Sequence, residues 1–278
     1  RRAAMAQLLA TPAIAWAGPG KAAPEPWTFE AYSAAMKASG RRQVIAADQW
    51  RATVARKPRM LATIHTVLSH HFTLPDPGVM RAFTEVPREY YHYHYDEQAD
   101  FSAAAYEDDS KPWRIGFGSA LSDYRGQAYM TQLCRPKPGE RALEVGTGSG
   151  FQVSILSRIV DKAYSIEIVE PLGKAVAPIF KPLGYDNIET RVGDGYYGWP
   201  EVEGGFDIVI VTCVAQHVPP PLLEQLKPGG RMVIPMGQPF KREQFLYIFT
   251  KDEDGKVSSR KDLGVYFIPM TGAMQVKR

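Results

Sequence analysis

From Arg141 onward, hydrophobic and polar positions alternate between two repeating patterns. Short apolar runs typical of buried strands are followed by segments with apolar residues at helical spacing. Strands that alternate with helices predict a parallel, doubly wound α/β sheet, and later strands without helices between them predict an antiparallel edge. The expected strands are 142–146, 163–169, 187–192, 206–212, 231–236, 244–251 and 265–269, and the expected helices are 151–160, 171–185 and 220–226.

The first quarter of the chain has a different pattern and predicts helices. Residues 18–26, GPGKAAPEP, read as a linker. In the segment that runs to Leu74, Met60, Ile64 and Leu68 recur at helical spacing. We interpret this stripe as the face of a helix that packs on the following domain, in preference to a helix that binds a partner. The predicted division is an N-terminal segment at 1–26, a helical extension at 27–74 and an α/β domain at 75–278.

The N-terminal segment, RRAAMAQLLATPAIAWAG, resembles a twin-arginine export signal. Gln7 and Pro12 interrupt its apolar stretch, so we favour a structural segment and a cytoplasmic protein, with export to the periplasm as the alternative. No stretch reaches the roughly 20 apolar residues that a membrane-spanning helix needs, so we expect no membrane span.

Composition excludes several classes of function. The 278 residues carry a formal net charge of +3, and no basic run is interleaved with aromatic residues, which disfavours nucleic-acid binding. The two cysteines, Cys134 and Cys213, suggest neither a disulfide framework nor a zinc site. His92 and His94 would share a face of an extended segment, but without a defined third ligand we expect no metal.

A glycine-rich turn, GTGSG, follows the first strand of the α/β domain and begins at Gly146. Glycines allow a tight turn and a close approach of the backbone to a ligand. In the dinucleotide fingerprint GxGxxG the last glycine would fall at Phe151, and no GK[ST] follows, so neither a pyrophosphate site nor a P-loop is favoured.

Acidic residues near the carboxyl ends of the next strands restrict which ligands fit the glycine turn. Glu167 ends the second strand, where a carboxylate can accept the hydroxyls of a ribose. Asp194 follows the third strand, in position to meet the exocyclic amine of an adenine. A glycine turn with a ribose acid and an adenine acid describes an adenosine without phosphates, which indicates S-adenosylmethionine.

Several motifs together resemble the protein-L-isoaspartate O-methyltransferase family. They are DPGVMRAFTEVPREYY, AYEDDSKPWRIGFG, LEVGTGSGFQ, GDGYYGWPE, FDIVIVTCVAQHVPPPLLEQLKPGGRMVIPMG and VYFIPMTG, in the order of that family over roughly residues 75–272. The resemblance implies a Rossmann-like class I S-adenosylmethionine-dependent methyltransferase fold. It also implies methylation of an isoaspartyl or related carboxylate in a peptide or protein.

The resemblance also implies roles for individual residues. Ser122 matches the serine assigned to the family's active site, and Thr271 matches a position in a C-terminal loop that closes over it. The expected cofactor residues are Glu144, Gly146, Thr147, Gly148, Glu167, Ile168, Asp194, Gly195 and Thr212. The expected substrate residues are Leu121, Ser122, Asp123, Val214, His217 and Thr271.

The reaction so implied demands little acid–base chemistry. A carboxylate with a pKa near ~4 is already anionic at neutral pH and can attack a sulfonium methyl without a general base. We therefore expect Ser122 to orient the carboxylate or the cofactor by a hydrogen bond, rather than to act as a nucleophile.

The stretch at residues 118–123 departs from the family pattern. Bacterial members read Gly-Gln-Thr-Ile-Ser, whereas this chain reads Gly118-Ser-Ala-Leu-Ser122, followed by Asp123. An unscreened anion beside a site for a carboxylate would cost about 1 kcal/mol or more, although Arg125 could neutralise it. The sequence leaves open a different carboxylate as substrate, on a dedicated peptide or a small molecule, and a non-catalytic domain that binds a partner.

Overall fold

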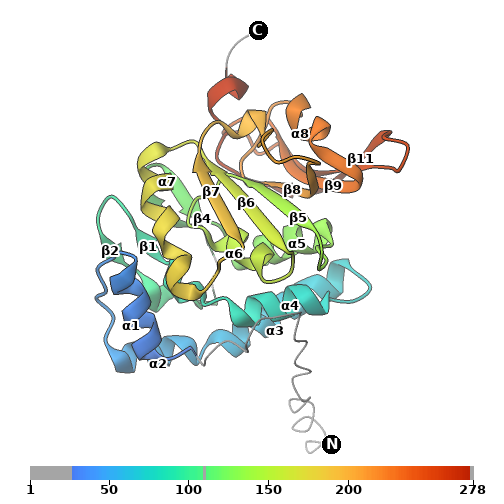
Figure 1. Cartoon of the computed structure of the whole chain (residues 1–278). Coiled ribbons are helices and arrows are strands. Elements are labelled where there is room, and N and C mark those ends of the chain that lie inside the picture. The colour runs from blue at the N-terminus through green and yellow to red at the C-terminus, as the bar shows by residue number, and fades with distance from the viewer. Residues whose placement is uncertain (1–26, 109–110, 276–278) are drawn as a thin grey trace, which may run out of the picture.

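The computed structural model describes residues 27–108 and 111–275 (Figure 1). The predicted export signal or structural segment at 1–26 lies outside the described residues. None of the helices in the described part of the chain is long and apolar enough to cross a membrane.

A seven-stranded sheet with the order β11-β10-β9-β8-β5-β6-β7 forms the centre of the molecule. Pairing is parallel from β9 through β8, β5 and β6 to β7, and antiparallel between β9 and β10 and between β10 and β11. The predicted doubly wound α/β fold with an antiparallel edge is confirmed. The strands are β5 Arg141–Val145, β6 Lys162–Glu167, β7 Ile188–Val192, β8 Phe206–Val211, β9 Leu226–Gly237, β10 Gln244–Lys251 and β11 Val257–Val265.

Alternate residues of the strands face two separate cores, as the period of two along a strand requires. In β8, Ile208 and Ile210 belong to the core that includes the N-terminal helices, whereas Val209 and Val211 belong to the core beneath α8. Figure 1 shows the N-terminal helices on one side of the sheet and α8 on the other. The helices of the domain are α5 Tyr124–Cys134, α6 Phe151–Ser157, α7 Glu170–Val176 and α8 Pro220–Glu224.

Two of the predicted elements differ from the structure. The helix expected at 171–185 ends at Val176 and continues as two 3-10 turns, Ala177–Ile179 and Lys181–Leu183. Each turn contains a proline, which lacks the N–H that an α-helix requires.

The last strand was expected at 265–269, but the edge strand is β11. β11 is largely exposed and polar, so its sequence shows no apolar alternation, and backbone pairing with β10 defines it. The chain after β11 runs beside the loop that follows β8, where Val214 bridges Pro269.

The N-terminal helices pack on the α/β domain. The stripe of Met60, Ile64 and Leu68 is buried, as its spacing predicts, and belongs to the same core as Phe151 of α6. The extension therefore shares a continuous core with the domain. The helices of the extension are α1 Phe29–Ala38, α2 Ala47–Val54 and α3 Lys57–His71, and α4 Pro77–Glu85 follows them.

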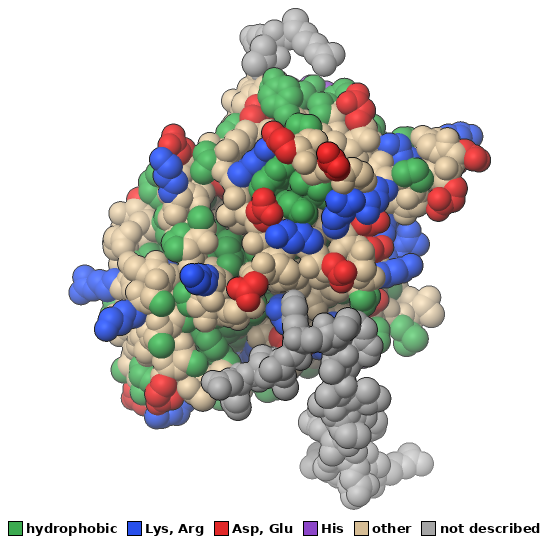
Figure 2. Space-filling view, viewed as in Figure 1, with side chains coloured by type: hydrophobic (Ala, Val, Ile, Leu, Met, Phe, Trp, Pro, Cys, Tyr) green, Lys and Arg blue, Asp and Glu red, His purple; other side chains and the backbone are tan. Residues whose placement is uncertain are grey.

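Short elements connect the N-terminal helices to α5. They are η1 Arg88–Tyr91, β1 Tyr93–His94, β2 Ala99–Asp100, η2 Ser102–Ala104, β3 Trp113–Gly116 and β4 Ser119–Leu121, and the 3-10 turns η5 Gly195–Tyr197 and η6 Gly272–Gln275 occur later. Acidic and basic side chains are interspersed over the face shown in Figure 2, in agreement with the small net charge.

Candidate cofactor and substrate site

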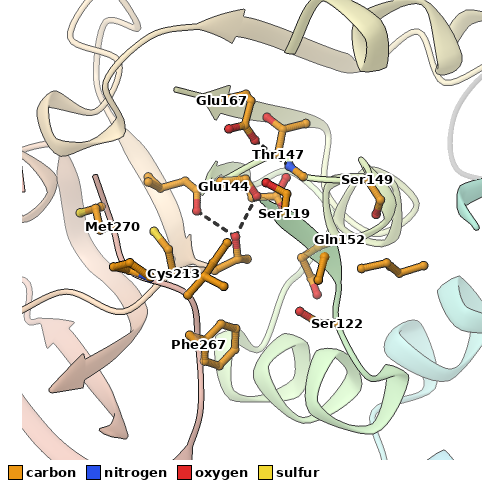
Figure 3. Close-up of a pocket in the computed structure, with 18 of the residues that line it drawn as sticks. Ser119, Ser122, Glu144, Thr147, Ser149, Gln152, Glu167, Cys213, Phe267 and Met270 are labelled. Carbon is orange, nitrogen blue, oxygen red and sulfur yellow. Dashed lines mark hydrogen bonds between the residues drawn. The ribbon is translucent and has the colours of Figure 1, made fainter. Parts of the chain in front are cut away.

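A cavity of about 520 Å³ lies at the carboxyl ends of β5, β6 and β8. This volume is within the range of roughly 300–1,000 Å³ typical of small-molecule sites. Figure 3 shows Glu144, Thr147 and Glu167 together on one side, with Cys213, Phe267 and Met270 along another. Parallel strands bring these residues together because their carboxyl ends meet at one edge of the sheet. The cavity is lined by all the predicted cofactor residues, namely Glu144, Gly146, Thr147, Gly148, Glu167, Ile168, Asp194, Gly195 and Thr212.

The turn after β5 is built on Gly146, whose φ is +98°. A Cβ at this position would lie 2.6 Å from Thr212 Oγ1, which is closer than side-chain atoms approach. Thr212 in turn donates a hydrogen bond to the Gly146 carbonyl at 2.8 Å. The missing side chain therefore allows the ends of β5 and β8 to close on each other beneath the cavity.

Glu167 ends β6 and holds the same turn from the other side. Its Oε2 accepts the Gly148 N–H at 2.8 Å, and its Oε1 accepts the Val169 N–H at 3.0 Å. Burial raises the pKa of Glu167, and these backbone hydrogen bonds act in the opposite direction. Each carboxylate oxygen keeps a second lone pair for a ligand hydroxyl.

Glu144 is buried within β5, and burial raises its pKa well above the ordinary range. Its Oε2 accepts a hydrogen bond of 2.6 Å from Ser165, whose hydroxyl lies 2.7 Å from that of Thr147. Glu144 thus supports the glycine turn, as the resemblance implies. Its Oε1 has no partner in the described part of the chain, although the residue lines the cavity. A buried oxygen of this kind suits an amino group of a ligand, because an unpaired buried carboxylate is costly.

Asp194 connects the cavity to the C-terminal segment. Its Oδ1 accepts the Tyr196 N–H at 2.9 Å, and its Oδ2 accepts the Ala273 N–H at 2.7 Å. The residue lines the cavity, and a carboxylate can accept about four hydrogen bonds, so it keeps capacity for an adenine amine. The predicted contact of Asp194 with adenine stays a prediction.

Another part of the cavity wall is formed by β4 and the start of α5. It includes Leu121, Ser122 and Asp123, as predicted, together with Ser119. Asp123 is the N-cap of α5, where its Oδ1 accepts the Arg125 N–H at 2.7 Å. Its Oδ2 also lies 2.7 Å from Nη2 of Arg125, the residue that the sequence offered to neutralise this anion.

The predicted substrate residues of the last third of the chain separate into two groups. Thr271 lines the cavity. Val214 and His217 are not among its lining residues. Val214 is buried, and its N–H donates to the Ile268 carbonyl at 2.8 Å, so it fixes the C-terminal segment rather than facing a ligand. His217 is exposed and lies edge-on to Tyr196, with 6.0 Å between ring centroids.

Several lining residues were not predicted from the sequence. Gln152 is buried in α6, and its Nε2 donates to Thr131 at 2.9 Å. Phe240, Tyr266 and Phe267 come from the β9–β10 turn and from the segment after β11. Tyr266 and Phe267 belong to the motif VYFIPMTG, and the expected closing of the C-terminal loop over the site was the signal that could have identified them. Phe240 lies outside the quoted motifs, and its segment meets the cavity only through tertiary packing.

One group of side chains in the described residues has the spacing of metal ligands, namely His94, Asp96 and Glu97. His94 Nδ1 already lies 2.6 Å from Asp96 Oδ1, and both acids are exposed. His92 is fully buried elsewhere, and its ring faces Trp113. The group carries no further sign of a ligand, and the expected absence of a metal stays a prediction.

Comparisons with known proteins agree with this geometry. The model of the family protein-L-isoaspartate(D-aspartate) O-methyltransferase (PCMT) matches residues 62–275. Protein-L-isoaspartate O-methyltransferase 1 of Nitrosospira multiformis is 46% identical over 71% of this chain and 80% of that protein. Protein-L-isoaspartate O-methyltransferase 2 of Syntrophobacter fumaroxidans is 45% identical over 72% of this chain and 77% of that protein.

Two solved structures share the fold. One, a protein-L-isoaspartate O-methyltransferase, has a TM-score of 0.65 and 25% identity over 77% of this chain and 67% of that one. A Plasmodium falciparum structure, described as a β-aspartate methyltransferase in complex with S-adenosyl-L-homocysteine, has a TM-score of 0.60 and 22% identity. It covers 75% of this chain and 97% of that one, and shows the fold alone. Together with the family match, these findings establish that the chain belongs to the protein-L-isoaspartate O-methyltransferase family.

Proposed function

We propose that the protein transfers the methyl group of S-adenosylmethionine to the free carboxylate of an isoaspartyl residue in a peptide or protein. One observation carries the proposal: a single cavity contains two groups of residues. The first is the glycine turn with Glu167, which we call the cradle, and the second is the end of β4 and the start of α5, which we call the Ser122 wall. The two relatives described above are named for this activity.

The residues around the cradle fit the cofactor. Glu167 would accept the ribose hydroxyls, because it retains lone pairs beside the Gly148 N–H that holds it. Glu144 Oε1 would accept a hydrogen bond from the amino group of the methionine part. This oxygen is buried and has no partner in the described ranges 27–108 and 111–275. Asp194 would receive the adenine amine. The bound cofactor supplies an electrophilic sulfonium methyl group.

The Ser122 wall would bind the carboxylate. A carboxylate is ionised at neutral pH, so no side chain has to remove a proton from it. The Ser122 hydroxyl would donate a hydrogen bond that aims one oxygen toward the cradle. Aromatic side chains such as Phe117 and Phe267 line the same cavity and limit the access of water. Rate enhancement would come from alignment in a water-poor site.

The other readings of the sequence have less support. Asp123 is paired with Arg125 and caps a helix, so it gives no reason to expect a substrate other than an isoaspartyl carboxylate. A non-catalytic domain would have no use for Glu144 Oε1, which carries a cost of burial that a ligand amine would offset.

The test uses two peptides of identical sequence, one with an isoaspartyl residue and one with a normal aspartyl residue. We expect methyl transfer, followed as methanol released by base, to the isoaspartyl peptide only. Calorimetry with S-adenosylhomocysteine should show binding to one site per chain. Binding without methylation of any isoaspartyl peptide would refute the proposed substrate, and an absence of binding would refute the proposed cofactor.

We also propose that the enzyme acts in the cytosol, where its cofactor is made. Residues 1–26 fused to a reporter protein test this proposal. Reporter activity retained in the cytosol is expected, and twin-arginine-dependent transfer to the periplasm would refute it.

A further inference from the structure

Arg88 is a buried arginine that contacts the wall of the cavity from behind. It lies in η1, and only 1% of its surface is exposed. Nη2 donates to the Ser122 carbonyl at 2.7 Å, and Nη1 donates to Gln127 Oε1 at 2.8 Å. Ser122 and Gln127 both line the cavity, whereas Arg88 is not among its lining residues. Arg88 thus fixes two lining residues without touching a ligand.

The burial of this guanidinium has a substantial free-energy cost. Desolvation lowers the pKa of Arg88 to about 10, and the nearby Asp123 carboxylate opposes this change. The group therefore stays charged at neutral pH. Its carbon centre lies 4.9 Å from the ring centroid of Phe151 and 5.6 Å from that of Tyr124. Removing one partner of a buried, hydrogen-bonded charge is strongly destabilising, so the charge holds its partners firmly in place.

The hydrogen bond from Arg88 to the Ser122 carbonyl fixes the orientation of the Ser122 backbone. Ser122 joins β4 to α5, and Asp123 on its other side caps α5. With its carbonyl held by Arg88, the peptide between Ser122 and Asp123 cannot rotate without breaking a charge-assisted hydrogen bond. The backbone of Ser122 is therefore fixed on both sides, and with it the origin of its side chain.

The neighbouring residue connects η1 to the N-terminal extension. Glu89 is buried and accepts hydrogen bonds from Trp27 Nε1 at 2.7 Å and from the Tyr106 hydroxyl at 2.5 Å. The same Tyr106 hydroxyl accepts the Arg88 N–H at 3.2 Å. The position of Arg88 thus depends on residues from before and after it in the chain, including Trp27 at the start of the extension.

We propose that Arg88 is a positioning residue for the methyl transfer. It acts by fixing Ser122 and Gln127 in the Ser122 wall of the cavity. The inference rests on the proposed function. The glycine turn and Glu167 lie on other elements and have no hydrogen bond to Arg88 in the described residues. Arg88 reaches that side of the cavity by packing on Phe151, which a methionine side chain can also do, so cofactor binding should change little. The effect should fall on turnover and on the affinity for the peptide.

The experiment compares Arg88→Met and Arg88→Lys with a matched control, Arg41→Met. Arg41 is also a buried arginine, lies over the Tyr90 ring and donates to the Tyr90 carbonyl at 2.5 Å. Neither Arg41 nor Tyr90 lines the cavity. Both methionine variants should lose stability, so assays are run below their measured unfolding temperatures.

For Arg88→Met we expect kcat/KM for the isoaspartyl peptide to fall roughly 10- to 100-fold, the range that a small misplacement produces. The Kd for S-adenosylhomocysteine should stay within about twofold of the wild-type value, a change of about 0.4 kcal/mol or less. Arg88→Lys, which keeps a donor, should recover part of the loss. Arg41→Met should lose much less kcat/KM than Arg88→Met, because the hydrogen bonds of Arg41 in the described residues go to Ser39 and to Tyr90 of η1, and neither residue lines the cavity.

Three results would overturn the inference. They are wild-type peptide kinetics in folded Arg88→Met, equal losses of cofactor affinity and kcat/KM, and an equal loss of kcat/KM in Arg41→Met. If Arg88→Met does not fold, Arg88→Lys and Gln127→Leu give the same comparison, and wild-type kinetics in both would also overturn it. A wild-type protein without activity on any isoaspartyl peptide would instead refute the proposed function, because the Arg88 comparison needs that activity.

Discussion

Replacement of Gly146 by alanine should damage both the fold and the cofactor site. The φ of +98° lies beyond the left-handed region near +50 to +70° that other residues occasionally adopt. The added Cβ would lie 2.6 Å from Thr212 Oγ1, so Thr212 would have to move. Its hydrogen bonds to the carbonyls of Val145, at 3.0 Å, and of Gly146, at 2.8 Å, would then be weakened.

The size of the effect follows from these two perturbations. A left-handed conformation costs a non-glycine residue roughly 1–2 kcal/mol. Loss of a hydrogen bond adds about 0.5–1.5 kcal/mol. We therefore expect Gly146→Ala to lower the free energy of unfolding by about 1.5–3.5 kcal/mol. Gly139→Ala is the matched control, because its φ is +85° and no atom lies within 4 Å of the added Cβ. It should lose only the conformational part, about 1–2 kcal/mol.

Urea unfolding measures the stability of both variants, and calorimetry measures their affinity for S-adenosylhomocysteine. Gly146→Ala should bind the ligand at least about tenfold more weakly, or about 1.4 kcal/mol, whereas Gly139→Ala should bind normally. In Gly146→Ala/Thr212→Ala the losses should be less than additive, because the clashing oxygen is gone. Equal stability losses in the two glycine variants, with normal binding in both, would refute the reasoning.

Three further predictions concern charged groups. The pKa of Glu167 is raised above 4.5, so its protonation as the pH falls through that raised value should weaken S-adenosylhomocysteine binding. Glu167→Gln should reduce this dependence in calorimetry without abolishing it, because the pKa of Glu144 is also raised; a wild-type affinity independent of pH down to 4.5 would contradict the prediction. Arg231 lies 2.7 Å from both Glu140 oxygens and is buried, so Arg231→Met should lower the free energy of unfolding in urea by about 3–5 kcal/mol, and a loss under about 1 kcal/mol would show that the pair is dispensable. Asp123→Ala should cost about 1 kcal/mol through loss of the α5 cap, and neither it nor Asp123→Asn should speed methylation; faster turnover would show that this carboxylate repels the substrate despite its pairing with Arg125.

The order of strands and helices could be predicted because each element carries its own periodicity. The predictions were wrong where that signal is missing or interrupted. β11 is exposed and polar, so pairing with β10 defines it, and prolines divide the segment after Val176 into 3-10 turns. Sequence periodicity reports how one segment is buried, and gives no information about backbone pairing at an exposed edge.

The candidate site divides in the same way. The cofactor side is local in sequence: Gly146, Glu167 and Asp194 each follow a strand of the parallel sheet, whose carboxyl ends necessarily meet. The sequence by itself therefore determined the fold class and the place of the candidate cofactor site. On the substrate side, the pairing of Asp123 with Arg125 is also local and could be anticipated, because the two residues are two positions apart. Only the tertiary structure places Arg88 behind Ser122, 34 positions away. Buried contacts between distant segments depend on how complete elements pack, and no local pattern of residues encodes that arrangement.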